Sequence, residues 1–322
     1  MIPARDGLAT LAEIEWCSDR LIDILAPKKG VLLAVLEGYF DESERPGTKV
    51  FCVAGHVFQP HQAKAFADDW RSLWGEYLPF HMTDFVSRRE QFSGMTDEDH
   101  LRLIQGAIAI IRERVDYSVA VSCKLSEIHA IKRGGSPAVS AYSMCIHLCM
   151  SQVGDWVRKT GRDDRVAYVF EQGYGTEADA RASIAESCQE PTLRESYRYA
   201  ADAFLPKGTP QLQAADFLAW EWAKCYDETL DQPKRQVRAS LWALAQGRKG
   251  RYWFSHAPGL NVFQALRAIE DPSWSAEGAV RLLATLHAID RLGLNDQVEA
   301  LLRGMFGEAP EFLKTWVIPG EE

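Results

Sequence analysis

The stretch Tyr39-Phe40-Asp41-Glu42-Ser43 lies between two apolar runs, residues 31–36 and residues 50–58. Both runs are short and rich in Val, Leu and Phe, and Pro46-Gly47 between them is typical of a turn, so the segment predicts a β-hairpin. Carboxylates are depleted in strands and are costly where a sheet is covered. Asp41 at the end of the first strand therefore needs a partner such as a metal cation, unless Asp41 and Glu42 simply open a polar turn.

The bulk composition favours a folded chain with a sizeable core. The chain has 322 residues, 47% of them hydrophobic, and it includes ten Trp. Its net charge is −9, so a nucleic-acid role has to rest on a local basic patch. We expect no signal peptide, and no apolar run approaches the roughly 18 residues of a membrane span, so no membrane partner is predicted.

The cysteines indicate a reducing environment. All seven are scattered singly and none forms a C-x-x-C pair, which fits reduced thiols and a cytoplasmic location. Cys145 and Cys149 are one helical turn apart and could clamp a soft metal. Since no further thiolate or His group accompanies them, we interpret them as core residues.

Hydrophobic periodicity and capping signals predict the elements after the hairpin. In chain order we expect a helix at 60–78, a helix at 96–114, a strand at 115–125, a helix at 138–160, a strand at 165–171, a helix at 176–190, a strand at 197–205, a helix at 212–226 and further helix beyond 233. This order predicts an α/β fold in which helices flank a mixed sheet. We divide the chain into a helical arm (1–30), a central domain (31–228) and a helical C-terminal extension (229–322).

Three acids stand in unusual places. Asp41 ends the first strand, Glu171 ends the strand that precedes Gly173-Tyr174-Gly175, and Asp216 lies within the apolar helical run of residues 212–220. A carboxylate among Ala, Phe, Leu and Trp loses several kcal/mol of hydration unless it is bonded or bound to a cation. The alternative is that Asp216 points to solvent on a narrow polar stripe shared with Gln213.

These acids predict a metal site if their elements are neighbours. Ligands of open α/β sheets gather beyond the carboxyl ends of strands, where Asp41 and Glu171 are expected, and a following helix can bring Asp216 across. Three carboxylates in one cleft repel each other without a cation, and oxygen ligands favour Mg²⁺ or Mn²⁺. Two such ions would polarise a phosphodiester and generate hydroxide.

Two motifs in this chain resemble those of the DUF3800 family. Residues 39–43 (YFDES) are similar to its Y-x-D-E-S-G motif, and residues 213–216 (QAAD) are similar to its Q-x-A-D motif. The resemblance covers roughly residues 31–228, with Glu171 matching an acidic strand end and Phe80-His81-Met82 matching a His-containing segment. It implies a ribonuclease-H-like fold and metal-dependent nuclease activity. Glu44 departs from the pattern, because the family usually has Gly there.

Several other residues are candidates for supporting roles. His81 could contact a scissile phosphate or position water, or it could be a packed, hydrogen-bonded residue beside Phe80. Glu42 could interact with the metal ligands without binding the metal itself, or it could be a solvated turn residue. Gln213 lies three residues before Asp216, on the same helical face, and could orient it.

A basic tract between residues 234 and 251 contains no acid and adjoins aromatic residues such as Trp242, Tyr252 and Trp253. Phosphate attraction combined with aromatic stacking would suit single-stranded nucleic acid. The alternative is a solvated helix face beside core aromatics. The candidate nucleic-acid contacts are Lys234, Arg235, Arg238, Arg248, Lys249 and Arg251.

The sequence leaves three functions open. The first is a divalent-metal nuclease acting on DNA or RNA through Asp41, Glu171 and Asp216. The second is a non-catalytic ribonuclease-H-like module that binds nucleic acid or a partner protein, with the acids as remnants. A protein partner or a homo-oligomer is a separate possibility. The third is a metal-free glycosidase that uses Asp41 and Glu171 as an acid/base pair.

Overall fold

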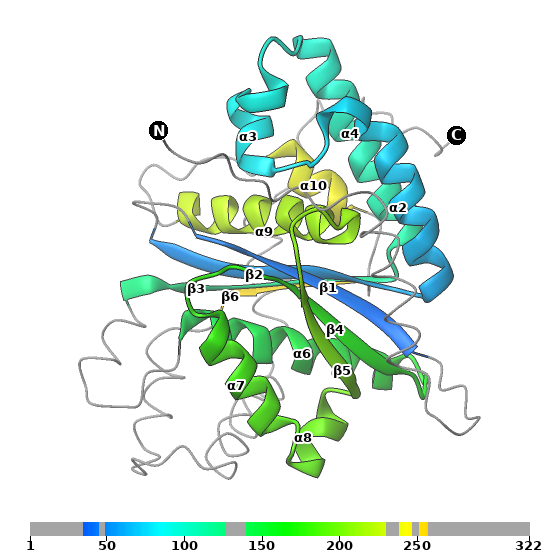
Figure 1. The fold of residues 1–322 in the computed structure, drawn as a ribbon, viewed down its shortest axis with the longest axis vertical. Coiled ribbons are helices and arrows are strands. Elements are labelled where there is room, and N and C mark those ends of the chain that lie inside the picture. The colour runs from blue at the N-terminus through cyan, green and yellow to red at the C-terminus, as the bar shows by residue number, and fades with distance from the viewer. Residues whose placement is uncertain (1–34, 45–48, 127–139, 230–237, 247–250, 257–322) are drawn as a thin grey trace, which may run out of the picture.

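The computed structural model describes residues 35–44, 49–126, 140–229, 238–246 and 251–256. They form a six-stranded mixed sheet in the order β5-β4-β1-β2-β3-β6, with helices on both faces (Figure 1). The strands are β1 (Val35–Ser43), β2 (Val50–Phe58), β3 (Tyr117–Lys124), β4 (Arg165–Glu171), β5 (Tyr199–Leu205) and β6 (Tyr252–His256). The predicted α/β class with a mixed sheet flanked by helices is confirmed.

Strands β1, β2 and β3 form an antiparallel meander at the centre of the sheet. The predicted pairing of the first two strands is confirmed, although the turn at 45–48 lies outside the described residues. Strand β4 pairs parallel to β1, β5 pairs parallel to β4, and β6 pairs parallel to β3. Later strands therefore cover both edges of the meander.

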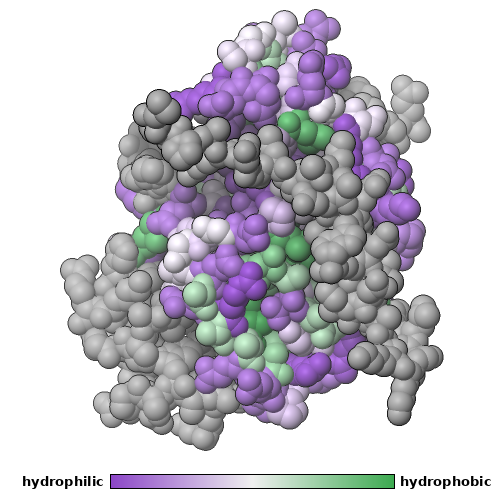
Figure 2. All heavy atoms as spheres, in the orientation of Figure 1, coloured by the Kyte–Doolittle hydropathy of each residue, from purple (hydrophilic) through white to green (hydrophobic). Residues whose placement is uncertain are grey.

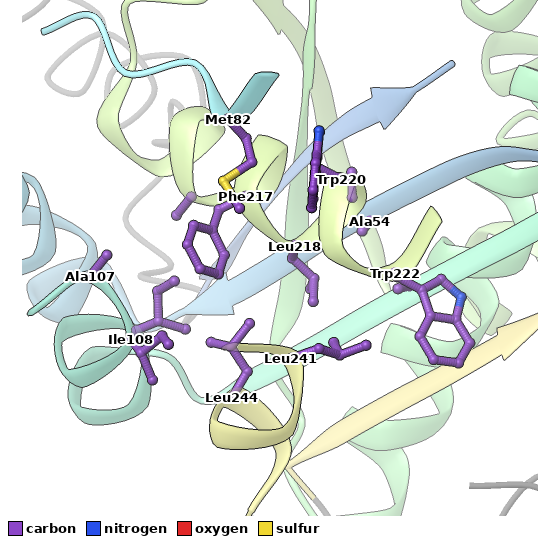
Figure 3. Packing of buried hydrophobic residues seen from close by; sticks show 14 of the residues in the cluster. Ala54, Met82, Ala107, Ile108, Phe217, Leu218, Trp220, Trp222, Leu241 and Leu244 are labelled. Carbon is purple, nitrogen blue, oxygen red and sulfur yellow. The ribbon is translucent and has the colours of Figure 1, made fainter. Parts of the chain in front are cut away.

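One helical layer lies on the face of the sheet that carries Tyr39 and Val169. It contains α9 directly over β1 and β2, with α2, α3, α4 and α10 beyond it (Figure 1). Figure 3 shows Phe217 and Leu218 of α9 among side chains of α4, α10 and β2. The helices are α2 (Pro60–Trp74), α3 (Met82–Ser87), α4 (Asp97–Arg114), α9 (Pro210–Thr229) and α10 (Ala239–Ala245), with 3₁₀ turns η1 (Gly75–Tyr77) and η2 (Glu90–Phe92).

The opposite face of the sheet carries Phe40 and Phe170 and is covered by the second helical layer (Figure 1). This layer consists of α6 (Ala141–Lys159), α7 (Glu177–Ser187) and α8 (Pro191–Ser196). Cys145 and Cys149 of α6 are fully buried here, as expected for core residues. Cys145 Sγ lies 3.9 Å from Cys123 Sγ, and the Cys149 thiol faces the Val53 carbonyl.

The structure differs from the sequence prediction at a few element boundaries. Strand β1 continues to Ser43, so Asp41 lies within the strand rather than at its end. The helix predicted at 176–190 ends at Ser187, and Pro191 starts the separate helix α8. The helical prediction beyond residue 233 holds for α10 but is wrong for 252–256, which pairs with β3 as a strand.

Strand β6 places residues beyond 228 in the same sheet as the central domain. The predicted arm at 1–30 and residues 257–322 of the predicted extension lie outside the described residues. Within the described ranges, no helix is both long and apolar enough to cross a membrane. On the face shown in Figure 2, hydrophilic residues dominate over the upper helices, and apolar residues form smaller patches among polar ones.

Candidate functional site

The backbone register brings Asp41 and Glu171 side by side. In the parallel pair of β1 and β4, Phe40 lies opposite Phe170, so the next residues along the two strands are Asp41 and Glu171. Side chains alternate along a strand, and Tyr39, two residues before Asp41, packs in the core beneath α9. Both carboxylates therefore face α9 from neighbouring strands, Glu171 at the end of β4 and Asp41 two residues before the end of β1. They are buried, with exposures of 2% for Asp41 and 7% for Glu171.

Helix α9 brings Asp216 to the same side of the sheet. Asp216 is only 5% exposed, so the alternative of a solvent-facing helical Asp is excluded. The backbone N–H of Met82 donates to its Oδ2 at 2.7 Å. Because the charges of Asp216 act on both Asp41 and Glu171, the three predicted acids lie in one electrostatic cluster.

Glu42 is the fourth acid of this cluster. Its N–H donates to Asp41 Oδ1 at 2.8 Å. Burial raises the pKa of Glu42 to about 7, and the nearby charge of Glu171 adds to the shift. Burial also raises the pKa of Asp41 well above its usual range, with further contributions from Glu42, Glu171 and Asp216. We call Asp41, Glu42, Glu171 and Asp216 the acid cluster.

Three oxygens of the acid cluster are buried with no donor from outside the cluster, Asp41 Oδ2, Glu42 Oε2 and Glu171 Oε2, although the carboxyls of Glu42 and Glu171 lie within hydrogen-bonding reach of Asp41. Unpartnered buried carboxylate oxygens are costly and call for a ligand. An all-oxygen donor set suits a hard divalent cation such as Mg²⁺ or Mn²⁺. Across the described ranges, however, no three Asp, Glu, His or Cys side chains already form a ready-made coordination shell.

Lys207 is a site residue that the sequence reading missed. It follows β5, and its Nζ lies 3.3 Å from Glu171 Oε1. Burial alone would lower the pKa of Lys207, but the carboxylates of Asp216, Asp41 and Glu171 outweigh it and raise that pKa. One signal was available: between Arg198 and Lys224, Lys207 is the only basic residue.

His81 lies at the rim of the acid cluster. Its Nε2 is 3.9 Å from Asp216 Oδ2, and its Nδ1 is 3.0 Å from Asp84 Oδ2. About a third of the side chain is exposed (33%), whereas Phe80 beside it is fully buried. The imidazole is therefore both hydrogen-bonded and open to an approaching ligand.

Gln213 does not orient Asp216 in the way the sequence suggested. Its Oε1 accepts from Trp70 Nε1 at 3.0 Å and from Phe80 N at 3.1 Å. Its Nε2 reaches the carbonyl oxygens of Lys207 at 3.4 Å and Gly208 at 3.3 Å. Gln213 thus ties together the two loops that carry His81 and Lys207, and acts on the site through their backbones.

The basic tract is only partly described. Arg251 is exposed, and Arg238 Nε lies 3.0 Å from Glu221 Oε2, a carboxylate with no exposed surface. The Arg238 guanidinium also lies over the Trp220 ring, 4.8 Å from its centroid. Arg238 therefore has a structural partner within the fold. The other four predicted contacts, Lys234, Arg235, Arg248 and Lys249, lie outside the described residues.

Glu44, which stands where the motif described above has Gly, contacts Tyr174 in the structure. Glu44 is exposed, and the Tyr174 hydroxyl donates to its carboxylate. Tyr174 packs against Phe51 and Tyr142 on the face of α6. The carboxylate of Glu44 is therefore hydrogen-bonded to the loop that follows β4.

The chain was compared with protein-family models and with curated proteins. No protein-family model matches the chain, and no curated protein matches it.

Proposed function

We propose that this chain is a divalent-metal-dependent nuclease with a ribonuclease-H-like domain of the DUF3800 type. The observation that carries the proposal is the set of three buried carboxylate oxygens that have no donor from outside the acid cluster and lie near the carboxyl ends of β1 and β4. A cation bound there would satisfy these oxygens and offset the mutual repulsion of the acids. The antiparallel hairpin followed by parallel crossover strands is compatible with the proposed fold.

Asp41, Glu171 and Asp216 would hold Mg²⁺ or Mn²⁺, and Glu42 adds a further oxygen beside Asp41. When bound, such ions supply activation of a water and stabilisation of the charge on a phosphodiester. Backbone N–H groups of the chain position the carboxylate ligands. The Met82 N–H fixes one oxygen of Asp216 at 2.7 Å, and Glu42 N–H fixes one oxygen of Asp41 at 2.8 Å.

His81 is placed to meet the substrate. It lies on the α3 side of Asp216, and Asp84 holds its Nδ1 at 3.0 Å. A partly exposed imidazole in this position can hydrogen-bond a phosphate oxygen or a water without displacing a buried group. Arg251 and the undescribed part of the basic tract would add attraction for a nucleic-acid backbone, either DNA or RNA.

One observation favours the non-catalytic alternative. Lys207 already gives the acid cluster a positive charge, so the same residues could serve a binding module with no metal. A glycosidase is less well supported. Neighbouring strands are about 4.8 Å apart, a spacing that leaves no room for the water of an inverting enzyme and would fit only a retaining mechanism, with carboxyl groups about 5 Å apart. A glycosidase mechanism also leaves Asp216 and Lys207 without a role.

The test is a cleavage assay on labelled single-stranded DNA, duplex DNA and single-stranded RNA, each with EDTA, Mg²⁺ or Mn²⁺. We expect cleavage of at least one substrate with metal and none with EDTA. Asp41→Asn and Glu171→Gln should reduce turnover to background. Binding of these substrates without cleavage under any condition would instead indicate the non-catalytic module.

Glu37→Gln is the matched control for Asp41→Asn. Glu37 lies on the same strand and the same face, is also buried at 9% exposure, and accepts a hydrogen bond from the Tyr39 hydroxyl at 2.7 Å. Its replacement removes a buried carboxylate outside the acid cluster. If Glu37→Gln reduced turnover as much as Asp41→Asn, the loss would reflect general damage to β1 and would not support a metal-ligand role.

A further inference from the structure

The position of Lys207 suggests how the acid cluster is kept stable before a metal binds. Lys207 lies two residues after the end of β5, and the ends of β4 and β5 are joined by a hydrogen bond from Gln172 N to Leu205 O at 2.9 Å. This pairing brings the lysine beside Glu171 at the same edge of the sheet. Its ammonium is 3.3 Å from Glu171 Oε1, and Glu171 is its only ion-pair partner within the described residues.

The backbone of Lys207 is held while its side chain is not. Gln213 Nε2 contacts the carbonyl oxygens of Lys207 and Gly208, and Thr209 N donates to Pro206 O at 3.3 Å. By contrast, the Lys207 side chain is 43% exposed, against 9% for that of Glu171. The ammonium can therefore leave Glu171 toward solvent without disturbing the loop.

A single lysine does not neutralise the acid cluster. With every carboxylate ionised, four acids and one ammonium leave three negative charges, and three buried oxygens keep no donor from outside the cluster. The Lys207–Glu171 pair is open to water on the lysine side, so part of its attraction is screened. A divalent cation that binds the same oxygens brings more charge to a more buried position than the ammonium does.

We propose that Lys207 is a built-in competitor of the divalent cation. It neutralises the metal-free acid cluster through Glu171 and gives up that carboxylate when the metal binds. The inference rests on the proposed metal-dependent function and deepens it. Lys207 then sets the metal concentration at which the site fills, because each binding event must break the Lys207–Glu171 pair.

The experiment measures Mn²⁺ binding by calorimetry and the melting temperature in EDTA for the full chain and three variants. Lys207→Met removes the charge and keeps the apolar stem, whereas Lys207→Arg keeps the charge. Lys224→Met is the matched control, because Lys224 forms a similar pair with Glu228 at 3.3 Å on α9, away from the acid cluster.

We expect Lys207→Met to bind Mn²⁺ about fivefold more tightly than the wild type, as removal of a competing, partly exposed ion pair implies. The same variant should melt at a lower temperature in EDTA, because the acids lose their counter-ion. Lys207→Arg should bind Mn²⁺ as the wild type does. Lys224→Met should leave the Mn²⁺ affinity unchanged.

The measurements distinguish an error in the competitor role of Lys207 from an error in the metal site itself. Equal or weaker Mn²⁺ binding by Lys207→Met, with normal binding by the wild type, would overturn the competitor role and leave the metal site standing. Absence of Mn²⁺ binding in all four proteins would overturn both. If Lys207→Met unfolds, the Mn²⁺ affinity of Lys207→Arg tests the competitor role. A several-fold difference between Lys207→Arg and the wild type would contradict a role based on charge.

Discussion

Replacement of Asp216 by Asn tests the metal-ligand role without knowledge of the natural substrate. Asparagine keeps the shape of the side chain and can still accept the hydrogen bond from Met82 N–H, which spans 2.7 Å. What the change removes is one negative charge from the acid cluster. The consequences should differ between the metal-free and the metal-bound protein.

In EDTA, several contributions to the free energy of unfolding oppose each other. The bond from Met82 loses its ionic character, which costs about 1 kcal/mol. At an effective dielectric constant near 20, unit charges about 6 Å apart interact by about 3 kcal/mol. Asp216 is repelled by Asp41 and Glu171 and attracted by Lys207, so its neutralisation relieves about one such interaction. Asp216→Asn should therefore stabilise the metal-free protein by up to about 2 kcal/mol.

With Mn²⁺ the wild type should gain about 2.7 kcal/mol at a metal concentration of about 100 times Kd. At about 2–4 °C per kcal/mol for a domain of this kind, the melting temperature should rise by about 5–10 °C. Asp216→Asn should lose this rise, together with any nuclease turnover. Melting curves of both proteins with EDTA and with Mn²⁺ measure the difference.

Glu221→Gln is the control on the same helix. Glu221 is fully buried and accepts from Ser240 Oγ at 2.6 Å, so its replacement should lower stability and leave the Mn²⁺ shift intact. Equal Mn²⁺ shifts for the wild type and Asp216→Asn would refute the ligand role. A loss of about 1–3 kcal/mol by Asp216→Asn, with or without metal, would identify Asp216 as a structural acceptor.

Three further predictions follow from the same structure. Because burial and the charge of Glu171 raise the pKa of Glu42 from 4.5 to about 7, the folded state holds this proton more tightly than the unfolded state. The metal-free protein should therefore lose stability as pH rises from 4.5 to about 7, whereas urea midpoints that rise over this range would contradict the buried carboxyl. Gly55→Ala should cost about 2 kcal/mol or more in urea unfolding, since its Cβ would lie 2.3 Å from the Tyr39 carbonyl oxygen; an unchanged midpoint would count against the close strand contact. Loss of three positive charges from the basic tract should lower nucleic-acid affinity and reduce the slope of log K against log salt concentration by about 2–3. An unchanged slope would assign the tract to ordinary solvated surface. The variant for this binding measurement combines alanine at Arg248, Lys249 and Arg251.

The sequence predicted those parts of the fold that have a strong local signal. Alternation of apolar residues identified the strand at 115–125, which the structure has as β3 (Tyr117–Lys124), and the Thr96 cap identified the start of α4, where its hydroxyl oxygen accepts from Asp99 N at 3.1 Å. Strand β6 was missed because its five residues have no periodicity that separates them from the flanking sequence, which was also predicted to be helical. Its conformation depends on pairing with β3, which lies more than a hundred residues earlier.

Some residues of the candidate site could be recognised from the sequence, and others only from the tertiary structure. Asp41, Glu171 and Asp216 stood out because a carboxylate in an apolar element is unusual in any context. Lys207 did not, because a lysine in a loop is ordinary until the pairing of β4 with β5 places it beside Glu171. Gln213 was assigned to Asp216 by helical spacing, but its hydrogen bonds reach Trp70 and Phe80, contacts that only the tertiary fold creates.

The order of strands in the sheet has a consequence for synthesis of the chain. The meander β1-β2-β3 is complete at residue 124, but its two open edges are covered only by β4 and β6, which end at residues 171 and 256. At about 5–20 residues per second, a ribosome leaves the β1 edge open for several seconds and the β3 edge for longer. Open edges invite pairing with other chains. Nascent chains that end near residue 126 should therefore depend on a chaperone, and ribosome-bound fragments of increasing length should lose that dependence after residues 171 and 256 emerge.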